Sequence, residues 1–194
     1  MRERGFAQAM LVAAALCLSF AAEPAHGGDV YSEEAVKAAF VLRFSSYVIW
    51  PEPPAAGAAF RIAVLGDVAM TSRLQALAEN RRVGGRAIEV IPISNVSEAR
   101  DAQVLYIGNR RSGSLPALLR NLGKREVLTI TDTANGLEAG SVINFLIVDQ
   151  RVRFEVSMEA ARRAGLRISS ALLSVAVRVQ GHGVEQVVNG EERR

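Results

Sequence analysis

Few side chains in this chain could carry out catalysis, and most of the candidates stand alone. The two histidines are His26, near the start, and His182, in a glycine-flanked stretch after the last predicted helix. A histidine-based metal site needs several convergent ligands, which two such positions do not supply. The serine-hydrolase elbow, the zinc-protease helix motif and the phosphate-binding loop motif do not occur in the sequence. We therefore predict no catalytic residue, no metal site and no cofactor.

Two polar segments follow predicted strands and could contact a ligand. The run 108–113 could hold a phosphate or carboxylate at the start of the next helix, or it could be a solvated loop. Residues 132–136 (DTANG) could coordinate a polar ligand at a strand end, or they could form a turn with Gly136 at positive φ. We favour the loop and the turn.

The remaining candidates are residues suited to contact with a partner. Trp50 is the single tryptophan, a residue type that anchors cores and is also enriched in interfaces. Arginines cluster in sequence near the end of the chain, and any two that face one cleft would favour an anionic ligand or partner. The predicted partner or dimer contacts are Phe40, Phe44, Tyr47 and Trp50, and the predicted anion or partner contacts are Arg153 and Arg167.

The first residues are predicted to be a targeting segment rather than part of the fold. Arg2 and Arg4 precede an apolar stretch over residues 7–22, and small residues suited to signal-peptidase cleavage follow. We predict a signal peptide over residues 1–27, a single domain over 28–194 and a periplasmic location. Because Cys17 is the one cysteine of the chain, the mature protein is predicted to lack thiols and disulfides.

The first predicted element of the mature chain is a helix over residues 32–49, with Ser32 as its N-cap and Pro51 as its stop. Apolar residues recur every four positions from Val36 to Val48, and a second apolar line adjoins them. Such a wide apolar face must be covered on more than one side. We therefore predict a homodimer that uses this helix.

The rest of the chain alternates between strand-like and helix-like patterns. Thr71 is predicted to cap a short helix, Pro116 and Gly123 bound another, and the closing helices cover 158–164 and 169–179. The pattern predicts an α/β single-domain sandwich, a mixed central sheet of about six strands with helices on both faces. The predicted strands are 60–66, 87–93, 104–108, 127–131, 142–148 and 152–157, the last two as an antiparallel hairpin.

Composition excludes several classes of protein. Of the 194 residues, 49% are hydrophobic and 22% are charged, so a disordered chain is excluded. The net charge is only +3, and the arginines are spread along the chain without a dense basic run. No nucleic-acid partner is therefore predicted.

Several segments together resemble the YfiR-like family of exported bacterial regulatory proteins. The most specific segments are the first helix ending in Trp50-Pro51 and the block from Asn144 to Leu173. The resemblance covers nearly the whole mature chain, and the positions that carry it look structural. It implies a periplasmic α/β protein that binds the periplasmic portion of an inner-membrane diguanylate cyclase and holds it inactive. It also implies that an outer-membrane lipoprotein can sequester the repressor.

A second class of function stays open at this point. A periplasmic small-molecule-binding protein could serve a transporter or a sensor with the same fold. The single predicted domain favours the repressor, because transporter-type binding proteins usually close two lobes around a cleft.

Overall fold

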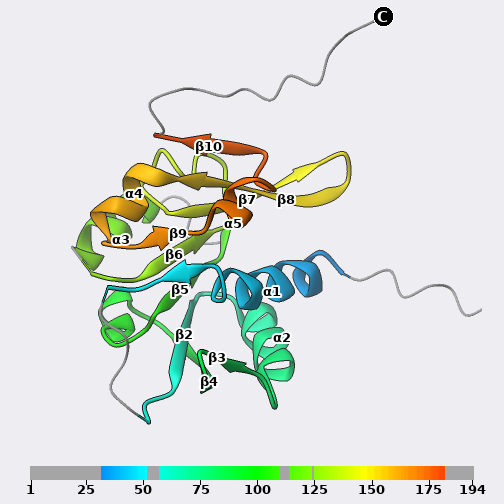
Figure 1. Cartoon of the computed structure of the whole chain (residues 1–194), viewed down its shortest axis with the longest axis vertical. Helices are drawn as coiled ribbons and strands as arrows, with labels where there is room; N and C mark the ends of the chain where they lie inside the picture. The colour runs from blue at the N-terminus through cyan, green and yellow to red at the C-terminus, as the bar shows by residue number, and fades with distance from the viewer. Residues whose placement is uncertain (1–31, 52–56, 110–113, 124, 182–194) are drawn as a thin grey trace, which may run out of the picture. The chain divides into compact units, whose positions relative to one another are not determined.

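A computed structural model of the chain describes residues 32–51, 57–109, 114–123 and 125–181. These residues form an α/β fold in which helices pack on both faces of a mixed sheet (Figure 1). The helices are α1 (Glu33–Phe44), α2 (Val68–Ala78), the 3-10 helix η1 (Val96–Ala99), α3 (Leu115–Leu122), α4 (Met158–Arg163) and α5 (Ser170–Leu173). The strands are β1 (Val48–Ile49), β2 (Phe60–Leu65), β3 (Arg82–Val83), β4 (Arg86–Ile93), β5 (Val104–Ile107), β6 (Leu128–Thr131), β7 (Ile143–Val148), β8 (Arg151–Ser157), β9 (Arg167–Ile168) and β10 (Arg178–Gln180).

The sheet is parallel at its centre, with one antiparallel pair toward each edge. Among the described residues its order is β10-β8-β7-β6-β5-β2-β4-β3. The central strands from β4 to β7 pair in parallel, whereas β3 pairs antiparallel with β4, and β8 pairs antiparallel with β7. This arrangement confirms the predicted mixed α/β sheet. The six predicted strands correspond to β2, β4, β5, β6, β7 and β8, and two short edge strands extend the sheet.

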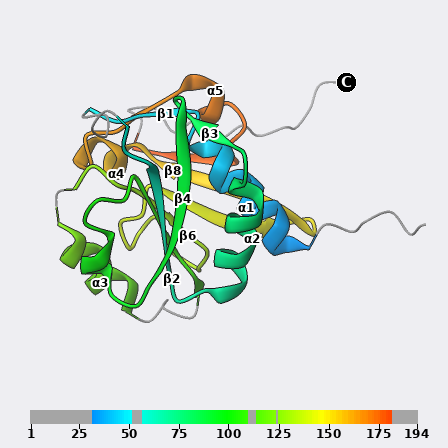
Figure 2. The same ribbon diagram turned by 90° about the horizontal axis from the view of Figure 1, so that it is seen from below.

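Two apolar clusters lie on opposite faces of this sheet. One joins α1, α2, α4 and α5 to side chains such as Ile62 and Tyr106, and the other joins α3 and η1 to Ala63 and Leu105. The alternation along β2 and β5 explains this division, because successive strand side chains point to opposite faces. Figure 2 shows α3 across the sheet from α1 and α2. Helices on both faces are therefore confirmed.

The first helix begins where predicted but ends earlier. The Ser32 hydroxyl accepts a hydrogen bond from the Ala35 N–H at 3.2 Å, which confirms the N-cap. The prediction that the helix continues to Ile49 is wrong, because α1 ends at Phe44 and β1 pairs antiparallel with β9. The β-branched pair Val48-Ile49 favours this strand, so the chain has left the helix before Pro51.

Two further helix predictions are corrected. The cap of α2 is Asp67, whose carboxylate accepts from the Met70 N–H at 2.8 Å, and Thr71 lies inside the helix. The prediction that the second closing helix runs without a break over 169–179 is wrong, because α5 ends at Leu173 and β10 pairs in parallel with β8. The predicted β7–β8 hairpin is confirmed, with Asp149 and Gln150 both at positive φ in its turn.

Candidate functional site

The carboxyl ends of the parallel strands gather polar residues along one edge of the sheet. Asp67 follows β2, Asn109 follows β5, and Asp132 follows β6. The chain passes from β2 to β4 on one side and then returns to β5 on the other, so the strand order reverses at β2. Open α/β sheets bind ligands in the crevice at such a reversal. This edge is therefore the candidate site.

The strands β2 and β5 approach closely at this edge. A Cβ atom added at Gly108 would lie 3.1 Å from Asp67 Cβ and 3.2 Å from its Oδ2. A larger residue at position 108 would push against the carboxylate that caps α2. The absence of a side chain at Gly108 thus leaves room for the Asp67 carboxylate between the ends of β2 and β5.

Lys37 joins the first helix to this edge. Its side chain is 5% exposed, and Nζ donates to Asp132 Oδ2 at 2.6 Å and to Glu33 Oε1 one turn earlier on α1. The Tyr106 hydroxyl lies 3.5 Å from the same Oδ2 atom. A buried ammonium group is costly without partners, and these two carboxylates provide them.

The protonation states of this cluster follow from its contacts. Burial alone lowers the pKa of Lys37, but hydrogen bonds to Asp132 and Glu33 outweigh it, so the pKa lies above its ordinary value. Burial, followed by the charge of Asp132, raises the pKa of the Tyr106 hydroxyl. A lysine nucleophile requires a lowered pKa. Lys37 therefore serves as a fixed cation, and Tyr106 stays a neutral phenol.

A hollow of about 830 Å³ opens beside this cluster. Polar groups of Glu33 and Asp132 line one part, and apolar side chains of β7 line another. The lining residues are Glu33, Asn109, Asp132, Thr133, Ala134, Phe145, Leu146 and Ile147. Carboxylates next to an apolar wall can bind a partner or ligand. Within the described residues, no group of three or more His, Asp or Glu is suited to hold a metal ion.

A second, buried polar network holds the strands behind this edge together. Asn144 on β7 donates from Nδ2 to Glu155 Oε1 at 2.9 Å and accepts from Thr131 Oγ1 at 2.8 Å. The other oxygen of Glu155 accepts from Arg178 Nε at 2.6 Å. Asn144 and Glu155 are almost completely buried, so their hydrogen bonds fix the register of β6, β7, β8 and β10.

The segment after β6 differs from the predicted turn. Asn135, with φ +61°, takes the left-handed position, and Gly136 does not have positive φ. Gly136 is required for space, since a Cβ atom there would lie 2.3 Å from Asn144 Oδ1 and 2.4 Å from Thr131 Oγ1. Asp132 faces Lys37 rather than its own turn. The sequence alone signalled a strand-end aspartate, but not its partner on α1.

The predicted aromatic contacts divide into buried and accessible residues. Phe44 has no exposed surface, and its ring packs against Phe145 and Phe154 with centroids 5.7 and 4.7 Å away. The wide apolar face of α1 is thus covered largely within the chain. Trp50 is half-buried, packs edge-to-face on Phe60 and donates from Nε1 to the Gln103 carbonyl at 3.2 Å.

The other predicted contacts lie at or near the surface. Phe40 packs against the core while remaining half-buried, and Tyr47 is also half-buried. Arg153 is exposed on β8 and Arg167 is exposed on β9, and neither lines the hollow at the carboxyl edge. Residues 110–113, 182–194 and 1–31, which include His26, His182 and the predicted signal peptide, lie outside the described residues. No helix among the described residues is long and apolar enough to span a membrane.

The fold and this edge define a doubly wound α/β protein in which Asp132, at the end of β6, is held by a buried lysine. A profile of the YfiR/HmsC-like family matches residues 34–177, and the chain belongs to that family. The family is regulatory rather than catalytic, periplasmic, and associated with diguanylate cyclase signalling. The family expected from the sequence is thereby confirmed.

One solved structure supports the fold alone. A conserved domain protein from Vibrio cholerae superposes with a TM-score of 0.55 at 10% identity, covering 77% of this chain and 60% of that one. This chain therefore spans about three fifths of that protein's length. A domain from Streptococcus pneumoniae described as an ABC domain in complex with L-Trp gives a TM-score of 0.47 at 12% identity, covering 62% of this chain and 55% of that one.

The structure explains why the residues of the resemblance look structural. Phe154 packs on Phe44, and Ser157 caps α4 by accepting from the Ala160 N–H at 3.1 Å. Gly165 has φ +68° and lies against Pro51, whose Cγ would be 3.3 Å from an added Cβ. These positions therefore stabilise the fold.

Proposed function

We propose that this protein represses a membrane-bound diguanylate cyclase by direct contact with its periplasmic portion, which lowers cyclic-di-GMP. The observation that carries the proposal is the family match over residues 34–177. The raised pKa of Lys37, which its paired carboxylates cause, argues against a lysine nucleophile at the carboxyl edge. The periplasmic partner requires export, for which the predicted signal peptide over residues 1–27 provides the route.

The surface that we assign to the cyclase is the tip of the β7–β8 hairpin. This hairpin projects from the sheet in Figure 1. Ile147 and Val148 are 50% and 40% exposed, and Arg151 and the predicted contact Arg153 are exposed on the opposing strand. Arginine is enriched among the residues that dominate binding energy at interfaces, and the buried centre of an interface is more apolar than its rim.

Repression by contact sets a thermodynamic requirement. The repressor must bind the inactive state of the cyclase more tightly than the active state, because equal affinity shifts no population. A change from mostly active to mostly inactive takes about 10⁴-fold differential affinity, roughly 5.5 kcal/mol. A well-packed interface with a few aromatic and arginine anchors supplies free energy of this size.

The test measures cyclic-di-GMP in a deletion strain complemented with the full chain or with residues 28–194. The full chain should restore a low nucleotide level, and the form without the leader should not. Ile147→Glu should also fail to restore it, whereas Val68→Glu, at an apolar residue that is 83% exposed on α2, should restore it. Equal repression by both chain forms would overturn contact in the periplasm.

A binding protein for a transporter or sensor is the alternative outcome of the same experiment. It would be supported if deletion leaves the nucleotide unchanged and abolishes uptake of a solute. The 830 Å³ hollow at the carboxyl edge is the feature that favours this alternative.

The homodimer and the lipoprotein partner remain part of the proposal. Because Phe44 is buried, a dimer contact would use the accessible residues after α1, namely Tyr47, Ile49 and Trp50. Ile49 is 57% exposed on β1. Sedimentation of the wild type and of Ile49→Glu at tens of micromolar tests self-association, and a monomeric wild type would exclude the dimer.

A further inference from the structure

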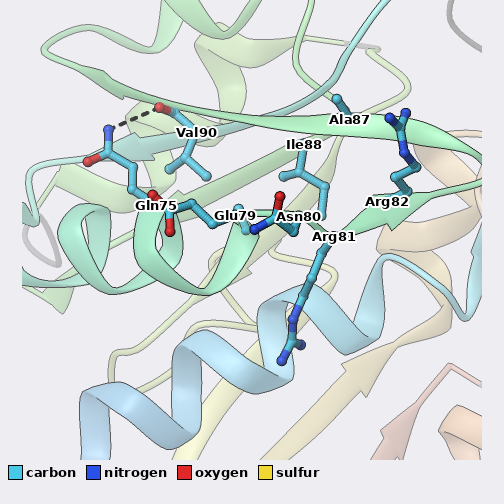
Figure 3. Close-up of a pocket in the computed structure, with 9 residues that line it drawn as sticks. Gln75, Glu79, Asn80, Arg81, Arg82, Ala87, Ile88 and Val90 are labelled. Atoms are coloured by element: carbon cyan, nitrogen blue, oxygen red, sulfur yellow. Dashed lines mark hydrogen bonds between the residues drawn. The ribbon is translucent and has the colours of Figure 1, made fainter.

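Three adjoining hollows surround the short β3–β4 hairpin, away from the carboxyl edge. Their volumes are about 330, 320 and 390 Å³, and Arg82 lines all three. Figure 3 shows the first of them, where the Arg81 side chain extends from the end of α2 toward α1. The second hollow lies between α1 and this hairpin.

The second hollow contains a concentration of positive charge. Arg43 from α1 and Arg81 from the end of α2 line it, and no carboxylate is among its lining residues. Arg82 from β3 also lines it, but Figure 3 shows the Arg82 side chain extending away from Arg81 and α1. Arg61 and Arg178, by contrast, each pair with a glutamate. Within the described part of the chain, the Arg81 side chain has no hydrogen bond or ion pair. The like charges of Arg43 and Arg81 repel each other, so an anion placed between them is stabilised.

Contacts already orient the Arg43 side chain. Its guanidinium lies 5.8 Å from the centre of the Tyr47 ring, whereas Arg82 Nη1 donates to the Gly85 carbonyl of the hairpin turn at 3.1 Å. Gly84 and Gly85, with φ of +55° and +80°, allow the tight turn that carries Arg82. A planar guanidinium whose direction is partly fixed loses less conformational freedom when it binds a phosphate or carboxylate.

The hollow also offers apolar contact. Leu42 is buried beneath it, and Val83 and Ile88 are half-buried at its wall. Its volume lies at the lower end of the range found for small-ligand pockets, roughly 300–1,000 Å³. Charge and apolar surface together suit a small molecule that carries both.

From these observations we propose that the hollow formed by α1, the end of α2 and the β3–β4 hairpin binds an organic anion, with its phosphate or carboxylate held by Arg43 and Arg81 and its apolar body on Leu42, Val83 and Ile88. The site is separate from the proposed cyclase contact and does not depend on it. A free metabolite and a lipid headgroup share this chemistry.

The test uses phenyl phosphate as the probe and calorimetric titration of the mature chain as the measurement. Phenyl phosphate should bind more tightly than inorganic phosphate or benzyl alcohol, which each carry only one half of the chemistry. Arg81→Gln and Arg43→Gln should each weaken binding about tenfold, because each removes a charge-assisted hydrogen bond. Ser46→Glu should abolish it by placing a carboxylate in the hollow.

Arg120→Gln is the matched control, because Arg120 is exposed on α3 across the sheet. It should leave binding unchanged. Equal weakening by Arg120→Gln and Arg81→Gln, or no difference between phenyl phosphate and inorganic phosphate, would overturn the site. Vesicles of phosphatidylglycerol distinguish a lipid headgroup from a free metabolite. If the protein binds both phenyl phosphate and the vesicles, and Arg81→Gln weakens both to the same extent, the site takes a lipid headgroup. Binding to vesicles without binding to phenyl phosphate would overturn the proposal.

Discussion

Lys37 Nζ lies 2.6 Å from Asp132 Oδ2, which ties the first helix to the end of β6 across 95 residues of sequence. The pair is asymmetric, since the lysine side chain is almost fully buried and the aspartate is one quarter exposed. Asp132 can therefore face a ligand or partner while Lys37 cannot. The cation fixes the position of the carboxylate at the rim of the 830 Å³ hollow.

Lys37→Met should lower the free energy of unfolding by about 1–3 kcal/mol, because it leaves Asp132 without its partner. Lys37→Met combined with Asp132→Asn should recover part of this loss, since no uncompensated charge then remains. Urea unfolding of the two variants and the wild type measures the difference. A single variant as stable as the wild type would contradict a structural role for the pair.

Stability should fall at alkaline pH. The pKa values of Lys37 and Tyr106 are both raised in the folded state, so their contributions are complete below the unfolded-state values, near 10.4 and 10. Above these values the folded chain holds more protons than the unfolded chain, and each group removes about 1.4 kcal/mol per pH unit. Urea unfolding between pH 8 and 11 measures this slope.

Tyr106→Phe isolates the tyrosine contribution. The phenyl ring fills nearly the same space, so stability at pH 8 should change by no more than about 1 kcal/mol. Above pH 10, the free energy of unfolding should fall less steeply with pH than in the wild type, by the slope that corresponds to about one proton. An unchanged slope would show that Tyr106 ionises as readily in the folded chain as in the unfolded one.

Gly136→Ala should destabilise the fold although the backbone there is not in the left-handed region. The new methyl group would overlap Asn144 Oδ1 and Thr131 Oγ1, and overpacking of this kind costs about 1–3 kcal/mol. Thermal unfolding against Ala134→Ser, an exposed neighbour, checks the result. A Gly136→Ala protein as stable as the control would mean that Asn144 moves without loss.

Phe44→Ala should cost about 3–5 kcal/mol, because Phe44 is fully buried among Phe40, Phe145 and Phe154. Phe44→Glu should therefore fail to fold. Phe40→Ala should cost less, since Phe40 is only half-buried. Similar losses for the two alanine variants, measured by urea unfolding, would contradict this ranking.

The sequence was informative where a segment is long and its pattern is strong. Continuous apolar runs located the six main strands, and Ser32 located the start of α1, because these signals are local. The short pairs β1–β9 and β8–β10 depend on partners more than 20 residues away, and no local pattern marks them. Ala171 and Leu172 favour the helix predicted through residue 179. The chain leaves this helix after Leu173, because Arg178 pairs with Glu155 of β8 in the sheet.

The candidate site shows the same division between local and distant causes. Asp132 could be predicted, because polar residues at the ends of parallel strands meet at one edge. Lys37 could not, because its burial depends on how α1 crosses the sheet. One signal was available: Lys37 lies four residues after Glu33 within an apolar helix, in a chain whose other cations are almost all arginines.

The two outermost strands determine how another protein can approach the sheet. The edge strands β3 and β10 have two and three residues, and each carries an exposed arginine. Beyond β3, the Val90 carbonyl accepts from Gln75 Nε2 at 3.3 Å, and Pro92 has no N–H to offer. Short, charged and proline-bearing edges oppose the addition of a foreign strand and the growth of aggregates. Association should therefore proceed through side chains, which leaves the order of the sheet intact when a partner binds or departs.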